Sequence, residues 1–196
     1  MQMKKLLIAI AASAAIGIFW LFSTSRAATR TPGYKVIRTD GRFEIRDYPE
    51  LIVATTAMEG DEMNRSFGQL FRFITGSNAS KEKIEMTSPV LINALKNKKS
   101  MSFIMPEKAV AKGLPKPADD RVSLGKMDSA RYAVIRFGGR RSAANDEKAT
   151  KLLKTWLAEQ KIAENGDPIF AYYDPPWTPV FLRRNKVMIQ IGMTAQ

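Results

Sequence analysis

The sequence of 196 residues contains neither cysteine nor histidine. Without cysteine there can be no disulfides, thiolate metal sites or cysteine nucleophiles. Without histidine, the commonest general base and the commonest transition-metal ligand are also missing. Acidic residues do not cluster at metal-ligand spacing, and Gly138-Gly139 lacks the further glycine and the lysine of phosphate-binding loops. We therefore expect a binding protein with no metal site rather than an enzyme, unless two carboxylates meet in the folded chain.

The first thirty residues contain no acidic residue, and the 17 residues Leu6–Phe22 contain no charge at all. Basic residues flank this apolar run on both sides: Lys4, Lys5, Arg26 and Arg30. This pattern is typical of an export signal, and Ser25 and Ala27 provide the small residues that signal peptidase requires. The run is also long enough for a tilted transmembrane helix. We expect export to the periplasm or another extracytoplasmic face, with the leader either cleaved or kept as an anchor over residues 6–22. The alternative, a buried core helix, is disfavoured by the charge pattern.

The remaining residues, 31–196, fit one domain with a formal charge of +8. A positive domain attracts anionic surfaces, although charges scattered like these also fit an ordinary solvated surface. The densest basic cluster is Lys96-Asn97-Lys98-Lys99, which we interpret as a hairpin tip. No groove-reading motif is present, so we expect no nucleic-acid partner. An anionic membrane surface is the better candidate, and we expect a monomer.

Strands are predicted at 34–38, 42–48 and 51–58, with Asp40-Gly41 as the hairpin turn between the first two. In the second strand, Arg42, Glu44 and Arg46 alternate with apolar or less polar residues, which predicts one solvent-exposed face and one buried face. A helix is predicted over 62–75, from an N-cap at Asp61 to the stop at Gly76. Its helical spacing defines an apolar stripe, widened by Phe71 and Phe73, that comprises Met63, Phe67, Leu70 and Ile74.

A polar loop at 77–86 and a hairpin of strands at 89–95 and 100–105 follow the helix. Residues 106–120, with three prolines and Gly113, predict a long loop. Strands are then predicted at 121–126 and 131–137, a helix at 144–160, and two strands at 169–173 and 187–191. Each half therefore has the order strand, helix, two strands. The fold class is α+β: a twisted antiparallel sheet with both helices packed against it, leaving a concave face or cleft.

Three blocks of sequence stand out by their composition. The first is Gly76-Ser77-Asn78 at the end of the first helix, and the second is the Lys-Ile-x-Met-Thr-x-Pro-Val block at 83–90. The third is the Tyr-x-Pro-Pro-Trp-Thr block at 173–178, followed by Arg183-Arg184-Asn185. In order and spacing these blocks make the chain resemble the SOUL haem-binding proteins from about Tyr34 to Ile191.

This resemblance implies a twisted, β-barrel-like sheet flanked by two helices, with a pseudo-two-fold repeat. It also implies binding of haem or a related tetrapyrrole in a shallow apolar cleft beside the first helix. The residues implied to face the cleft or form its rim are Met63, Asn64, Phe67, Phe71, Tyr173 and Trp177. Arg65 and Arg72 on the same helix are candidates for charge-assisted hydrogen bonds to the two carboxylates of a porphyrin.

The chain departs from those family members that hold haem iron through histidine, so an axial ligand could come only from Met, Tyr or Lys. Core packing is the commoner use of a stripe such as Met63, Phe67 and Leu70. We expect core roles also for the methionines at 86, 101 and 105, a turn-stiffening role for Pro175-Pro176, and a solvated pair at Arg183-Arg184. The alternative function is a membrane-surface interaction module with no small-molecule ligand.

Overall fold

The computed structural model describes residues 30–58, 63–95 and 98–192. The predictions made for the leader, for the N-cap at Asp61 and for the tip at Lys96-Asn97 lie outside these residues. Residues Thr31–Gln196 form one compact unit. In the described ranges, no helix is both long enough and apolar enough to span a membrane.

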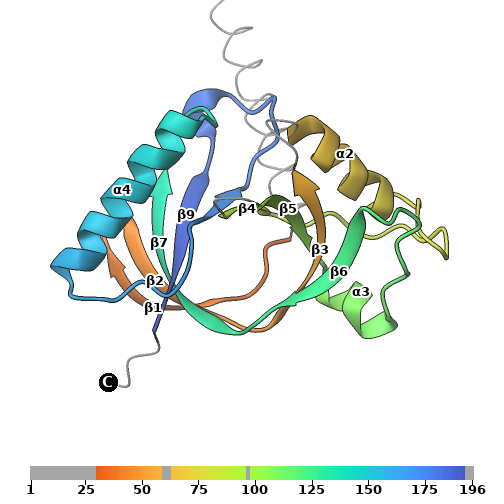
Figure 1. Ribbon diagram of the computed structural model, residues 1–196, viewed down its shortest axis with the longest axis horizontal. Coiled ribbons are helices and arrows are strands. Elements are labelled where there is room, and N and C mark those ends of the chain that lie inside the picture. Colours follow the sequence, from red (N-terminus) through yellow and green to blue (C-terminus); the bar gives the residue numbers. More distant parts are fainter. Residues whose placement is uncertain (1–29, 59–62, 96–97, 193–196) are drawn as a thin grey trace, which may run out of the picture. The chain divides into compact units, whose positions relative to one another are not determined.

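The centre of the domain is a nine-stranded antiparallel sheet with the order β1-β2-β7-β9-β8-β4-β5-β3-β6 (Figure 1). The strands are β1 Lys35–Asp40, β2 Phe43–Tyr48, β3 Leu51–Met58, β4 Val90–Leu95, β5 Lys98–Ile104, β6 Val122–Met127, β7 Ala130–Phe137, β8 Ile169–Tyr172 and β9 Asn185–Ile191. The prediction of a barrel-like sheet is wrong in one respect. The sheet is open, because β1 and β6 form its two edges and do not pair with each other.

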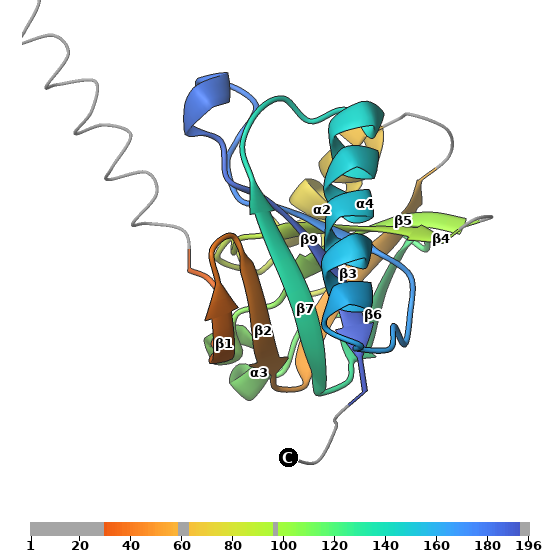
Figure 2. The same cartoon turned by 90° about the vertical axis from the view of Figure 1, so that its left-hand side faces the viewer.

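Two long helices cover the sheet: α2, Met63–Ile74, and α4, Ala143–Glu159. α2 packs on β3, β5 and β6, whereas α4 packs on β7 and β9. Figure 1 shows the two helices on opposite flanks of the curved sheet, and Figure 2 shows α4 lying along β7. The strands of the two predicted units lie side by side, as β7-β9-β8 and then β4-β5-β3. The internal repeat itself stays a prediction.

A third helix, α3 at Glu107–Lys112, lies in the stretch for which we predict a loop. Pro106 at its N-cap has φ −65°, which suits a helix start, and Gly113 ends it at φ 87°. No residue of α3 is buried. The helix is short and has no apolar stripe, so periodicity gives no signal for it.

The core consists of three clusters, one under each long helix and one on the opposite face of the sheet. No helix in the described ranges covers the opposite face. It is buried because the sheet curves so that its two halves pack against each other: Val53 of β3 and Val134 of β7 belong to the same cluster. Met101 and Met105 are buried and Met86 is partly buried, which confirms their predicted core role.

This curvature makes one prediction for β2 wrong. Ile45 packs under α4, as expected, but Arg46 on the predicted wet face is only 1% exposed and Glu44 is buried too. Alternation therefore identified the two faces of the strand correctly, while the tertiary structure buried both.

Candidate functional site

The inner face of α2 consists of Leu70, Phe73 and Ile74, together with two buried polar residues. Those two are held by hydrogen bonds. Thr56 Oγ1 donates to Gln69 Oε1 at 2.7 Å, and Ser66 Oγ donates to the carbonyl oxygen of Ala57 at 3.2 Å. Because these polar residues share the buried face, its centre is rotated away from the predicted stripe. The core role predicted for Leu70 is confirmed, whereas Phe67 lies at the margin.

An aromatic ridge of Met63, Phe67 and Phe71 runs along one side of α2, at the i, i+4, i+8 spacing of one helix face. The rings of Phe67 and Phe71 are stacked with centroids 5.8 Å apart. The Phe67 ring also meets Phe103 of β5 edge-on at 5.2 Å. Yet Phe67 is 37% exposed and Phe71 is 45% exposed. The ridge is therefore anchored to the core on one side and open to solvent on the other.

Gly68 interrupts the outer surface of α2 beside the ridge. Residues three and four positions away are its neighbours on the helix surface, so it lies between Phe71 and Arg72 on one turn and Asn64 and Arg65 on the other. The guanidinium of Arg72 folds over it, with Nη1 3.7 Å from the place that a Cβ atom would take. Glycine inside a helix lowers stability by about 1 kcal/mol relative to alanine. Its presence at position 68 of the predicted helix was therefore a sign of a functional surface, which sequence reasoning missed. Gly68 leaves the helix surface between the aromatic ridge and the Arg72 guanidinium without a side chain of its own, and we call this surface the glycine strip.

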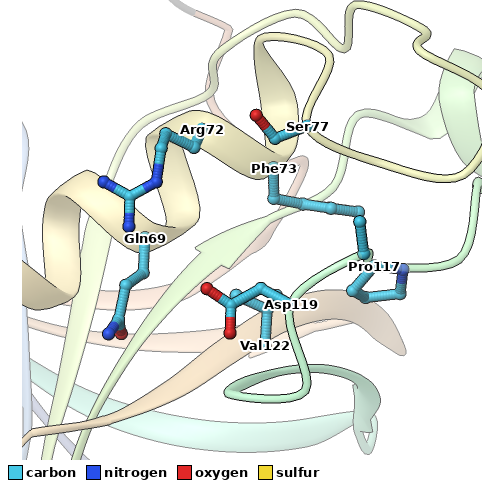
Figure 3. A pocket seen from close by; sticks show the side chains of 8 residues that line it. Gln69, Arg72, Phe73, Ser77, Pro117, Asp119 and Val122 are labelled. Carbon is cyan, nitrogen blue, oxygen red and sulfur yellow. The ribbon is translucent and has the colours of Figure 1, made fainter.

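A hollow of ≈ 130 Å³ lies on the other side of α2 (Figure 3). The side chains that converge on it include those of Arg72, Gln69 and Asp119. Hydrogen bonds from Arg121, from Nε at 2.8 Å and Nη2 at 2.7 Å, lower the pKa of Asp119 to about 2. Pockets for drug-sized ligands have volumes of about 300–1,000 Å³, so this mixed, small hollow is not the predicted apolar cleft. The cleft stays a prediction.

The Gly76-Ser77-Asn78 block ends α2. Gly76 has φ 115°, and the amide of Ser77 donates to the carbonyl of Arg72 at 2.9 Å, closing the last turn. The buried Asn78 side chain donates to the carbonyls of Phe73 at 2.9 Å and Glu82 at 2.7 Å, and accepts from the amide of Glu82 at 3.0 Å. These residues therefore hold the helix end and the following loop in place, which in turn fixes the ridge.

The Tyr-x-Pro-Pro-Trp-Thr block begins a loop over residues 173–184 that is held by its own hydrogen bonds, and we call it the braced loop. The carboxylate of Asp174, which is 4% exposed, accepts from the amide of Arg184 at 2.6 Å and from its Nη2 at 3.0 Å. Arg183 donates to the carbonyls of Thr178, at 2.8 Å, and of Pro176. The prediction of a solvated Arg183-Arg184 pair holds for the exposure of Arg184, whose side chain is 47% exposed, but it missed that both arginines bond to residues of this loop.

The structure thus brings only part of the predicted site together. Met63, Phe67 and Phe71 form the ridge, and Asn64 lies exposed beside it. Arg65 and Arg72 lie on the outer surface of the helix, on either side of Gly68. Tyr173 is partly buried next to Lys186, and Trp177 is 76% exposed on the braced loop. Within the described part of the chain, Trp177 makes no aromatic contact with the ridge.

A cluster of tyrosines and cations on the inner face of the sheet was missed by sequence reasoning. Arg46 forms an ion pair with Glu44, donates to the hydroxyl of Tyr48 at 3.1 Å, and lies 4.1 Å from the ring centroid of Tyr34. The ammonium of Lys186 lies 4.4 Å from the ring centroid of Tyr173. Burial, and then the nearby charge of Arg46, lower the pKa of Lys186 to about 8. The only signal in the sequence was the alternation of charged residues along β2, which we interpreted as a solvent-exposed face.

Comparisons with known proteins agree with this architecture. The family described as SOUL heme-binding protein matches residues 29–190. No curated protein matches the chain in sequence. Among the described residues, no group of three or more acidic side chains is placed to hold a metal ion.

Solved structures share the fold at low identity. The C-terminal domain of EcmrR is 10% identical with a TM-score of 0.60, over 81% of this chain and 98% of that one. A hydrolase from Listeria innocua is 8% identical with a TM-score of 0.55, over 80% and 94%. EcmrR in its complex with DNA is 10% identical with a TM-score of 0.57, over 97% and 68%. At such identities these likenesses establish the fold alone.

Proposed function

The chain belongs to the SOUL haem-binding protein family, and we propose on that basis that residues 31–196 bind haem or a related tetrapyrrole along the aromatic ridge of α2. The family is one of binders rather than enzymes. The observation that carries the proposal is the stacked pair Phe67 and Phe71, which is half exposed although it belongs to a well-packed helix. Contiguous exposed apolar patches are typical of surfaces that bind a ligand or partner.

A porphyrin is a flat apolar plate, and the ridge offers it two exposed, stacked aromatic rings. Complete burial of a phenylalanine side chain is favourable by about 1.5–3 kcal/mol. A ligand that covered the exposed parts of Phe67 and Phe71 would gain part of this free energy. Gly68 adds no side chain of its own beside the ridge, and a plate would lie there once the flexible side chain of Arg72 turns from Gly68 toward a carboxylate. Tyr173 and Trp177 would belong to the rim of the predicted cleft.

Porphyrin carboxylates need cations, and Arg72 and Arg65 lie on either side of Gly68. The guanidinium of Arg72 already extends over the glycine strip. Charge-assisted hydrogen bonds from such groups are stronger than neutral ones and would fix the orientation of the plate.

Iron ligation by histidine is impossible, because the chain has no histidine. Met63 belongs to the ridge, but no side chain of the ridge offers the strong imidazole donor found in many haem proteins. We propose that affinity comes from apolar contact and the two carboxylates rather than from the iron. Haem and metal-free protoporphyrin should then bind with similar affinity.

The test is a titration of residues 31–196 with hemin, followed by the shift of the Soret band, and with protoporphyrin, followed by fluorescence. Phe71→Ser should weaken both ligands about tenfold, since it removes one aromatic ring whose exposed part the ligand would cover. Val36→Ser is the matched control, because Val36 on β1 has the same 45% exposure and lies outside the ridge. A flat hemin titration, or an equal loss in both variants, would refute the site.

We also propose that residues 1–30 export the domain to the periplasm or another extracytoplasmic face, with or without cleavage. The support is the charge pattern around the apolar run Leu6–Phe22. Fusion of residues 1–30 to a reporter enzyme that is active only outside the cytoplasm should give activity. Replacing residues in the middle of the run with lysine should abolish it, and activity that survives this change would contradict export by this segment.

A further inference from the structure

We propose that the braced loop, residues 173–184, is a preformed tip that inserts into the surface of an anionic lipid bilayer. The loop carries the two most exposed aromatic side chains of the described residues, Trp177 at 76% and Phe181 at 83%, and with them Val180 at 41%. The 3-10 turn η1, Val180–Leu182, stands out beyond the ends of the strands at the top of Figures 1 and 2. Protruding apolar side chains can enter a bilayer without any rearrangement of the domain.

Hydrogen bonds from two arginines to backbone carbonyls hold the loop in place. Arg183 donates to the carbonyls of Thr178 and Pro176, and Nη2 of Arg141 donates to the carbonyl of Asp174. Pro175, Pro176 and Pro179 further restrict the backbone. These contacts fix the positions of Trp177 and Phe181 before any partner binds, so binding need not order the loop.

The charge around the tip matches an anionic surface. Neither residues 175–186 nor residues 138–145 contain an acidic residue, and Asn185 Nδ2 donates to the carbonyl of Gly139 at 3.1 Å, which holds the two segments together. Arg140 is exposed, and the side chain of Arg184 is 47% exposed. The one acidic residue of the loop, Asp174, is buried and paired with Arg184. The exposed aromatic side chains of the tip therefore lie on segments whose exposed charged residues, Arg140 and Arg184, are basic.

This arrangement favours lipid over a protein partner. Tryptophan and other aromatic residues concentrate at the interface of bilayers, where the ring lies at the level of the headgroups. Basic residues near an anionic leaflet each contribute about 1 kcal/mol of attraction. The rest of the domain adds to the attraction, because residues 31–196 carry +8. Trp177 is also assigned to the rim of the predicted cleft, but Val180 and Phe181 belong to no part of the proposed tetrapyrrole site, so the inference does not depend on tetrapyrrole binding.

The experiment uses residues 31–196, which contain every residue of the described core and form a compact unit. This fragment keeps two of the three tryptophans, the buried Trp156 and the exposed Trp177. Vesicles contain equal parts of phosphatidylcholine and phosphatidylserine, either ordinary or brominated in the acyl chains, and phosphatidylcholine vesicles serve as the neutral comparison. Binding is followed by co-sedimentation, and insertion by quenching of tryptophan fluorescence.

We expect salt-sensitive binding to the anionic vesicles, with quenching that disappears in Trp177→Phe. Phe181→Ser should lower the partition coefficient about tenfold, because one aromatic side chain loses its apolar environment. Val180→Ser should weaken binding, whereas Val110→Ser, at a similarly exposed valine on α3, should not. Hemin titration of the same variants separates the two proposals, since Phe181→Ser should keep hemin affinity and Phe71→Ser should keep vesicle binding.

Three results would overturn the inference. The first is no binding to anionic vesicles. The second is binding without quenching of Trp177, which would mean adsorption by charge alone. The third is equal vesicle binding by the wild type and Phe181→Ser. Each is independent of the outcome with hemin, so failure of the membrane tip and failure of the tetrapyrrole site can be told apart.

Discussion

Substitution of Gly68 should change stability and ligand affinity in opposite directions. The residue lies inside α2, partly exposed, in ordinary helical conformation. A Cβ atom added there would meet only Arg72 Nη1 at 3.7 Å, an ordinary van der Waals distance at the end of a flexible side chain. Alanine would therefore fit without strain. A side chain that improves the helix would at the same time stand on the strip where the proposed plate lies.

The magnitude of the stability change follows from helix propensity. Glycine to alanine inside a helix is favourable by about 0.8–1.0 kcal/mol. For a domain of this size, such a gain raises the midpoint of thermal unfolding by about 2–4 °C. Leucine has nearly the same propensity as alanine, so Gly68→Leu should also stabilise the domain. Its larger side chain would fill the space between Phe71 and Arg72 and hold a plate away from the ridge.

The assay combines thermal unfolding, followed by circular dichroism, with hemin titration of residues 31–196. We expect both variants to unfold at higher temperature than the wild type, and Gly68→Leu to bind hemin about tenfold more weakly, which corresponds to the loss of one partly buried aromatic contact. Unchanged hemin affinity in Gly68→Leu would show that no ligand covers this strip. A lower unfolding temperature in Gly68→Ala would show that the helix needs glycine for its own packing.

Three further predictions concern residues away from the ridge. Arg46→Met should lower the free energy of unfolding by about 3 kcal/mol in urea denaturation, because it removes the ion pair and hydrogen bonds that Arg46 provides to the buried carboxylate of Glu44; a loss below about 1 kcal/mol would contradict a stabilising network. Lys186→Met should stabilise the domain at pH 7, and its advantage should shrink as the pH rises. The pKa of Lys186 is about 8 in the folded protein against an ordinary 10.5, so the unfolded chain binds more protons between these values and the wild type gains stability there. An advantage in urea denaturation that is equal at pH 7 and pH 10 would refute this. Asn78→Ala should cost about 2 kcal/mol by the same assay, since it removes the three hydrogen bonds made by a side chain that is only 4% exposed; a neutral effect would mean that water replaces the side chain.

Local pattern accounts for what could be predicted about the fold. The two long helices and the strands begin and end within a few residues of the predicted limits, because period, caps and turns are local properties of the chain. The sequence did not predict α3, because a short and exposed helix has no periodic pattern of apolar residues. The open sheet could not be predicted either. Whether β1 and β6 pair depends on how far the sheet curves, which is the sum of many small twists.

The candidate site shows the same division. Sequence alone determined that the chain has no histidine or cysteine, and the order of its blocks indicated the family. It also named Phe67 and Phe71, but could not say which aromatic residues of α2 face water. That depended on Ser66 and Gln69, which satisfy their hydrogen bonds on β3 and so turn the buried face toward Phe73.

The arginines make the point most clearly. Arg46, Arg183 and Arg184 have the same charge in the sequence, and pattern placed all three at the surface. In the structure, Arg46 is buried in an ion pair, whereas Arg183 and Arg184 brace the loop that exposes Trp177 and Phe181. The sequence determined which groups the protein possesses. Tertiary structure decided which of them are buried: Arg46 and its partner Glu44 are only two residues apart on β2, and both are buried because the curved sheet encloses them.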